Sequence, residues 1–319
     1  MPYTSLPMGI RMNRRAFLAA TGSAVLLAAC GTKAKAEPGR PGAILPGIAS
    51  DPLPSPAAEG PAPAAPAATP APRVVRPQGT YERTLMAGTL WATAVSIRDS
   101  GVARNAAIVL GGVHGNEPGG WMAAEEVANW VPRSGSLLVI PRANRLAIDS
   151  FVRTFEEIGD LNRLYPGDPG SALAMERMAG EITALATEFG CGLALDMHES
   201  WAFYVDAPGT GTAALGQTIT TGQGPLWPNF GPAIATALND GLPSHDRFIV
   251  RDGTNLGRPA ASATPATTGR GRSSLGLGGH VAGLTPVLVE MGQQGQDVDR
   301  RIALHLLVAR QALSMIEVV

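Results

Sequence analysis

The stretch that decides the fold is residues 106–117, Ala106-Ala-Ile-Val-Leu-Gly-Gly-Val-His114-Gly-Asn-Glu117. Its first eight residues form an apolar run of the length and composition expected for a buried β-strand. A helix-like pattern follows over residues 120–130. The segment therefore predicts a strand, a tight turn and a helix. The polar residues of the quoted stretch fall in the turn, just past the end of the strand.

The chain continues this alternation beyond the quoted stretch. Further strands are expected at 90–97, 136–140, 193–197 and 286–291, and further helices at 172–188, 232–238 and 298–316. Strands that alternate with helices are typical of a fold in which helices cover both faces of a mostly parallel sheet. We therefore expect an α/β three-layer sandwich with a mixed, mostly parallel central sheet. The Gly- and Thr-rich segments 207–230 and 252–279 are expected at the surface, where they shape the rim of a site.

Residues 1–78 are expected to lie outside this domain, which spans 79–319. In residues 1–30, Arg14-Arg15 precedes a mild apolar run, which is typical of a twin-arginine export signal. The run ends in Leu-Ala-Ala-Cys30, which resembles a bacterial lipobox and makes Cys30 the expected lipidation site. A soluble signal peptide with a chance cysteine is the alternative. Residues 31–78, rich in Pro and Ala, predict a disordered tether.

These features predict an exported, periplasmic lipoprotein that contacts the membrane only through its lipid anchor. The formal net charge of −1 gives no argument for binding nucleic acid or an anionic membrane surface. The chain has two cysteines. If Cys30 carries lipid, no second cysteine is left to form a disulfide with Cys191, and no disulfide is expected to stabilise the domain. The apolar context of Cys191 favours packing over a nucleophilic role.

Four ionisable residues come at the ends of predicted strands. His114 and Glu117 follow one strand, His198 ends another, and Glu290 closes the apolar run Thr-Pro-Val-Leu-Val. Open α/β sheets place their sites outside the carboxyl ends of strands, so we expect these side chains to meet. Two imidazoles and a carboxylate suit a catalytic zinc ion, which keeps a fourth position for water. We predict one Zn²⁺ per chain. Asp196 is a candidate to support an imidazole from behind, with a strand-end carboxylate as the alternative.

The remaining polar residues suggest a hydrolytic site for a substrate with a carboxylate. Glu290 is predicted to be the general base that takes a proton from zinc-activated water, because burying an ionisable strand end is otherwise costly. A salt-bridged strand end is the alternative. Asn162 and Arg163 are predicted to hold the carboxylate, since Arg offers a planar fork and Asn a neutral donor. Arg153 is a candidate to stabilise the oxyanion of the scissile carbonyl.

Together these residues resemble the zinc carboxypeptidase superfamily, and within it the succinylglutamate desuccinylase/aspartoacylase branch. The resemblance runs from about residue 105 to about 310 and is carried by His114-Gly-Asn-Glu117, Asn144, Arg153, Asp160-Leu-Asn162-Arg163-Leu-Tyr-Pro-Gly, His198 and Glu290. It implies an eight-stranded mixed sheet of the phosphorylase/hydrolase-like type and hydrolysis of an amide bond beside a free carboxylate. The resemblance also implies that His114, Glu117 and His198 are zinc ligands and that Glu290 is the catalytic carboxylate. It implies that Arg153 stabilises the oxyanion. It makes three residues substrate-binding: Asn144, Asn162 and Arg163.

One departure from the superfamily bears on the substrate. True carboxypeptidases carry a mobile tyrosine between the last zinc ligand and the catalytic glutamate, and here only Tyr204 lies in that interval. The sequence therefore favours a deacylase that acts on a small carboxylate-bearing substrate, an N-acyl amino acid or a peptide. An exported metallocarboxypeptidase or a peptidoglycan stem-peptide peptidase or amidase is an alternative. A non-catalytic binding lipoprotein is an alternative of another class.

Several further residues stay open at this point. Glu199 is ambiguous and could belong to the rim of the site. His245 and His280 are expected to be loop histidines, with a contact to substrate or support of a metal ligand as the alternative, and His305 is expected on a helix face.

Overall fold

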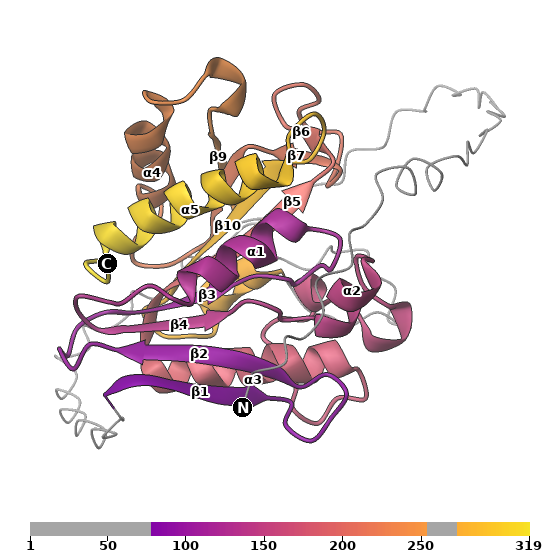
Figure 1. The fold of residues 1–319 in the computed structure, drawn as a ribbon, viewed down its shortest axis with the longest axis vertical. Helices are drawn as coiled ribbons and strands as arrows, with labels where there is room; N and C mark the ends of the chain where they lie inside the picture. The colour runs from indigo at the N-terminus through magenta and orange to yellow at the C-terminus, as the bar shows by residue number, and fades with distance from the viewer. Residues whose placement is uncertain (1–77, 254–272) are drawn as a thin grey trace, which may run out of the picture. The chain divides into compact units, whose positions relative to one another are not determined.

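The computed structural model describes residues 78–253 and 273–319. In this part of the chain an eight-stranded sheet has the order β1-β2-β4-β3-β5-β10-β8-β9 (Figure 1). Its strands are β1 (Gly79–Leu85), β2 (Thr93–Asp99), β3 (Ala106–Leu110), β4 (Ser136–Ile140), β5 (Cys191–Ser200), β8 (Thr218–Thr221), β9 (Ile249–Asp252) and β10 (Thr285–Gly292). The predicted export signal and Cys30 lie outside the described residues, as does the tether up to residue 77, and they stay predictions.

The helices and the smaller elements connect these strands. The helices are α1 (Pro118–Val127), α2 (Arg145–Ser150), α3 (Ala174–Phe189), α4 (Phe230–Asn239) and α5 (Val298–Met315). Single 3₁₀ turns are η2 (Glu156–Ile158), η3 (Leu161–Arg163) and η4 (Ser244–Asp246), and η5 (Ser274–Gly279) is longer. Strands β6 (Ala202–Phe203) and β7 (Ala214–Gly216) form a separate two-stranded sheet. No helix in the described ranges is long and apolar enough to cross a membrane.

The centre of the large sheet is parallel. Strands β4, β3, β5 and β10 run in the same direction, whereas β1, β2 and β8 pair antiparallel with their inner neighbours. The outermost strand β9 is parallel to β8. The predicted α/β fold with a mixed, mostly parallel sheet is therefore confirmed. Because the four central strands are parallel, their carboxyl ends lie along one edge, where the predicted site residues gather.

Two hydrophobic cores make the domain a three-layer sandwich. Side chains of β3 alternate between them, with Ile108 and Leu110 on one face and Ala107 and Val109 on the other. The first core packs against α3, and the second packs against α1, α4 and α5. Figure 1 shows α1 and α5 in front of the sheet and α3 behind β1 and β2. Strands covered on both faces explain the continuous apolar runs seen in the sequence.

The rim segments differ from the prediction. Segment 207–230 was expected at the surface, but it contains β8, whose four residues are buried and pair with β10. The run Thr218-Ile-Thr-Thr looks polar, yet threonine is β-branched and suits a strand. Within 252–279, residues 254–272 lie outside the described part. The following η5 buries Ser274–Leu277, so this end of the segment is not a surface loop either.

We expect Leu304→Ala to lower the free energy of unfolding by roughly 2–5 kcal/mol, because it opens a cavity between α5 and the sheet. Leu304 is fully buried, whereas Leu307 on the same helix is 41% exposed. Leu307→Ala is the matched control and should change stability by about 0.5 kcal/mol or less. Urea unfolding followed by circular dichroism measures both. Equal losses in the two variants would contradict the placement of α5.

Candidate metal centre

The turn after β3 places the first two candidate ligands. Strand β3 ends at Leu110, and α1 begins at Pro118, a residue suited to the first position of a helix. A Cβ atom at Gly115 would lie 2.0 Å from the backbone carbon of Ala147, so this position requires glycine. The turn can therefore press against α2 and direct His114 and Glu117 toward the carboxyl end of β5.

The third candidate ligand and the predicted base lie on neighbouring strands. His198 in β5 is the direct parallel partner of Glu290 in β10. Both residues are near the carboxyl ends of their strands, and both are buried. Residues from β5, β10 and the turn after β3 thus meet at one edge of the sheet, as the sequence predicted.

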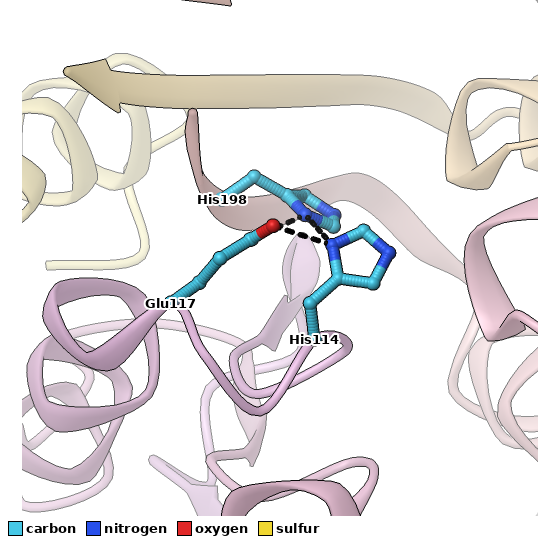
Figure 2. A group of neighbouring side chains, drawn as sticks. All are labelled: His114, Glu117 and His198. Atoms are coloured by element: carbon cyan, nitrogen blue, oxygen red, sulfur yellow. Dashed lines mark hydrogen bonds and ion pairs between the residues drawn. The ribbon is translucent and has the colours of Figure 1, made fainter. Parts of the chain in front are cut away.

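Figure 2 shows the side chains of His114, Glu117 and His198 converging on one point. Glu117 Oε1 lies 2.7 Å from His114 Nδ1, and Glu117 Oε2 lies 2.9 Å from His198 Nδ1. The two Nδ1 atoms are 3.1 Å apart. Each residue offers one ligand atom, and these atoms lie within 4.8 Å of one another. The three side chains are thus grouped as the ligands of one metal ion would be.

A carboxylate lies behind each imidazole. His198 Nε2 is 2.9 Å from Asp196 Oδ2, and His114 Nε2 is 3.2 Å from Asp160 Oδ1. A carboxylate only accepts hydrogen bonds, so each Nε2 carries the proton and donates it. The Nδ1 lone pairs then face inward, which is how ligating histidines are held in metal sites. Asp196 has the supporting position predicted for it, and Asp160 supports the other imidazole.

The donor set fits a metal cation. Once the two Nδ1 atoms are deprotonated, as metal binding requires, two nitrogen lone pairs and a carboxylate face one another in a buried place, an arrangement that a positive charge stabilises. Two imidazoles and one carboxylate are the ligand set of the zinc peptidases. His114, Glu117 and His198 are therefore the residues that would hold the metal.

The electrostatics of the cluster agree with this conclusion. Burial alone would raise the pKa of Glu117, but the charges of His114 and His198 outweigh burial and hold the pKa below its ordinary value. Burial alone would lower the pKa of His198, yet Asp196 and Glu117 raise it well above the usual range. The carboxylates thus favour positive charge at the cluster centre, and a divalent cation meets the same preference.

Glu290 lies next to this cluster, and its pKa is raised toward neutral pH. Burial raises its pKa to about 8, and the charge of Glu117 adds to the rise, while His198 and Arg153 oppose it. Its Oε2 atom is buried without a hydrogen-bond partner in the described part of the chain. A divalent cation in the cluster would lower this pKa through its charge. The group is therefore placed to gain and lose a proton near neutral pH.

Arg153 lies at the open side of the cluster. Its Nη2 donates a hydrogen bond to Asp160 Oδ2 at 3.0 Å, and its Nη1 is 3.7 Å from Glu117 Oε1. Its backbone carbonyl accepts a hydrogen bond from Gly115 N. The side chain is 41% exposed, so one cation borders both the cluster and solvent.

The predicted carboxylate-binding pair follows directly after Asp160. The backbone N–H of Asn162 donates to Asp160 Oδ1, and Asn162 Oδ1 accepts a hydrogen bond from Ser274 N at 3.1 Å. Arg163 Nη1 donates to the Asn162 carbonyl, while the residue is exposed. Asp160 therefore connects the cluster to the segment that carries Asn162 and Arg163.

Asn144 has a structural position in the fold. Its side chain caps α2 by accepting a hydrogen bond from Ala147 N, and its Nδ2 donates to Thr154 Oγ1. Its predicted contact with substrate stays a prediction.

Of the other histidines, His305 borders the cluster, since the charge and the backbone of His198 both act on its pKa. The His245 ring contacts that of Phe203 at 3.9 Å, and His280 is exposed. His305 lies on α5, as predicted, but it is buried, and burial lowers its pKa to about 3. Cys191 is buried at the start of β5, in agreement with a packing role.

Sequence reasoning left Glu199 ambiguous and did not single out Arg301 or Gln293. Glu199 is buried rather than on the rim, and it pairs with Arg301. Burial raises the pKa of Glu199 to about 7, against the opposing charge of Arg301. The available signal was spacing, since Arg301 lies four residues before His305 and seven before Val308, on the buried stripe of α5.

Residues 103–202 match the family model of the succinylglutamate desuccinylase/aspartoacylase catalytic domain. The predicted resemblance to this branch is confirmed. The matched part contains the three cluster residues and the segment of Asn162 and Arg163, and it ends before Glu290. No curated protein matches the chain.

Solved structures share the fold at low sequence identity. Product-bound Csd4, a cell shape determinant from Helicobacter pylori, aligns with a TM-score of 0.56 and 15% identity over 70% of this chain and 55% of its own. The mDAP-bound form of H. pylori Csd4, described as a D,L-carboxypeptidase, aligns with a TM-score of 0.54 and 15% identity. The alignment covers 70% of this chain and 54% of the Csd4 chain. The ectoine utilization protein EutE (DoeB) from Ruegeria pomeroyi aligns with a TM-score of 0.50 and 17% identity. The alignment covers 76% of this chain and 69% of the EutE chain. The chain thus spans about half the length of the Csd4 structures.

We expect Asp196→Asn to weaken zinc binding by about 10–100-fold, because the amide no longer fixes the proton on His198 Nε2. Competition with a chromogenic chelator measures the dissociation constant without any substrate. Asp149→Asn removes a carboxylate that pairs with Arg145 on the exposed surface of α2 and serves as the control. Unchanged zinc affinity in Asp196→Asn would show that Asp196 does not orient a ligand.

Proposed function

We propose that this protein is a zinc-dependent hydrolase that cleaves an amide bond beside a free carboxylate. The observation that carries the proposal is the buried convergence of His114, Glu117 and His198 next to Glu290. The match to the desuccinylase/aspartoacylase catalytic domain supports hydrolysis of an acyl-amide bond. An N-acyl amino acid is the substrate class that we favour.

Zinc, when bound, would act as a Lewis acid that polarises the carbonyl and lowers the pKa of water. The protein's part is to fix the ligands and to move the proton. Asp196 and Asp160 hold the two imidazoles with their Nδ1 atoms inward. Glu290 takes the proton of the attacking water on its carboxylate and then delivers it to the leaving nitrogen. A pKa near neutrality suits both transfers.

Arg153 is proposed to stabilise the oxyanion that develops on the scissile carbonyl. Its guanidinium borders Glu117 on one side and solvent on the other, so a carbonyl entering from solvent would meet it. Asp160 restrains the side chain through Nε and Nη2. Restrained donors stabilise developing charge because they need no reorganisation during the reaction.

Asn162 and Arg163 are proposed to bind the substrate carboxylate. Arg163 is exposed beside the site, and a planar guanidinium can contact both oxygens of a carboxylate. The buried Asn162 is fixed by its bond from Ser274 N and holds the backbone beneath Arg163. The free carboxylate would thus set the distance from the substrate's end to the scissile bond.

A second candidate function is a peptidase that acts on peptidoglycan stem peptides. It is supported by the fold shared with Csd4, which is described as a D,L-carboxypeptidase. The proposed export by residues 1–30 and anchoring through Cys30 fit either candidate. Assays of the chain with N-acyl amino acids and murein peptides distinguish the two: release from acyl-amino acids supports the deacylase, and cleavage of peptides alone supports the peptidase.

We expect Glu290→Gln to bind zinc as the wild type does and to lose activity by at least about 10²-fold, since the amide cannot accept the proton. Inductively coupled plasma mass spectrometry gives the zinc content, and initial rates give kcat. Glu317→Gln, which removes an exposed carboxylate that pairs with Arg104, is the matched control and should keep full activity. An active Glu290→Gln enzyme would exclude Glu290 as the base.

We expect Arg163→Ala to lower kcat/KM by about 10²-fold for substrates with a free carboxylate, the loss typical of a charge-assisted hydrogen bond. Against the matching carboxamides, the variant and the wild type should be equally poor. Arg145→Ala, which removes a half-exposed arginine of α2, is the control. If the wild type cleaves acid and amide equally well, the carboxylate-binding role of Arg163 is wrong.

A further inference from the structure

Helix α5 carries a buried arginine, Arg301, which pairs with Glu199 of β5. Arg301 and Glu199 are 8% and 4% exposed, and Arg301 Nη1 donates a hydrogen bond to Glu199 Oε2. Gln293, just after β10, donates from Nε2 to the same oxygen at 3.1 Å and to the carbonyl of Asn116 at 2.9 Å. Arg301 and Gln293 thus meet at one carboxylate of β5, and Gln293 links it to the turn that carries His114 and Glu117.

This carboxylate is connected directly to two of the metal-binding residues. Glu199 follows His198 in β5, and its backbone N–H donates to Glu117 Oε2 at 3.0 Å. Its side chain also lies against the first turn of α1, where a Cβ at Gly119 would be 2.1 Å from Glu199 Oε1. Fixing the Glu199 side chain therefore fixes the backbone donor that holds one ligand and the strand residue that carries another.

Stability alone is a weak reason for such a buried pair. Removing two charges from water costs about as much as their attraction returns, and apolar replacements are often neutral or stabilising. Arg300, the neighbour of Arg301 on α5, makes an ion pair with Asp246 of η4. The Arg300 side chain is 41% exposed, and its ion-pair partner is not a cluster residue. The buried pair differs from this one in being bonded to the residues around the metal site.

We propose that Arg301, acting through Glu199 and Gln293, is a positioning residue that holds Glu117 and His198 in the geometry that binds zinc. The inference rests on the metal site of the proposed function. Arg301 donates its hydrogen bond to Glu199, which is not one of the three cluster residues. It secures the Glu199 carboxylate, which in turn keeps the Glu199 N–H directed at Glu117 Oε2.

The test measures metal binding in the full-length protein, with zinc and cobalt as the probes. Arg301→Met and Glu199→Gln should each weaken zinc binding by about 10–100-fold, the range for residues that orient ligands from behind. The double variant should lose little more than either single variant, because both act through one contact. The visible spectrum of the cobalt-loaded protein should shift in each variant, since it reports coordination geometry. Arg300→Met should bind zinc as the wild type does and leave the cobalt spectrum unchanged.

Two further variants keep the test decisive if a charge variant fails to fold. Arg301→Lys keeps the charge and should restore most of the affinity lost in Arg301→Met. Gln293→Leu removes only the link between Asn116 and Glu199 and should weaken zinc binding several-fold. A folded Gln293→Leu protein with wild-type affinity and cobalt spectrum would overturn the proposal, as would wild-type values in Arg301→Met or no recovery of affinity in Arg301→Lys. Failure of the wild type itself to bind zinc would instead contradict the proposed function.

Discussion

Two imidazole nitrogens and a carboxylate are held within 4.8 Å of one another in a buried place, and the rest of the site depends on that arrangement. Asp196 and Asp160 fix the protons on the outer ring nitrogens, so the inner lone pairs face each other. Such a group of acceptors is stable only around a positive charge. The carboxylates outside the cluster, Asp196 and Asp160, thus favour a positive charge at its centre.

The sheet explains why residues so distant in sequence can form this group. Four parallel central strands bring their carboxyl ends to one edge, so the turn after β3, the end of β5 and the end of β10 are neighbours. Helices pack against both faces of the sheet and support this edge. The tight turn at Gly115 and the early start of α1 at Pro118 then direct His114 and Glu117 inward. Parallel pairing, rather than any single contact, makes the site possible.

The sequence predicted the central strands and the cluster because both leave local signals. Apolar runs mark β3, β5 and β10, and His114, His198 and Glu290 stand at their ends. Strand β8 gave no such signal, since its threonine-rich run is buried only through pairing with β10. The role of Arg301 could not be predicted either. Its spacing on α5 indicates a buried position, but it does not indicate which residue Arg301 pairs with. A carboxylate from β5 becomes that partner only when α5 packs on the sheet.

The central claim is that His114, Glu117 and His198 bind one metal ion through the inner nitrogens. A crystal structure of the zinc-loaded protein, with diffraction data collected above and below the zinc absorption edge, tests it most directly. One anomalous peak per chain is expected, bonded to Nδ1 of His114, Nδ1 of His198 and the carboxylate of Glu117. No peak at this edge of the sheet, or a peak bonded to other residues or to the Nε2 atoms, would contradict the claim.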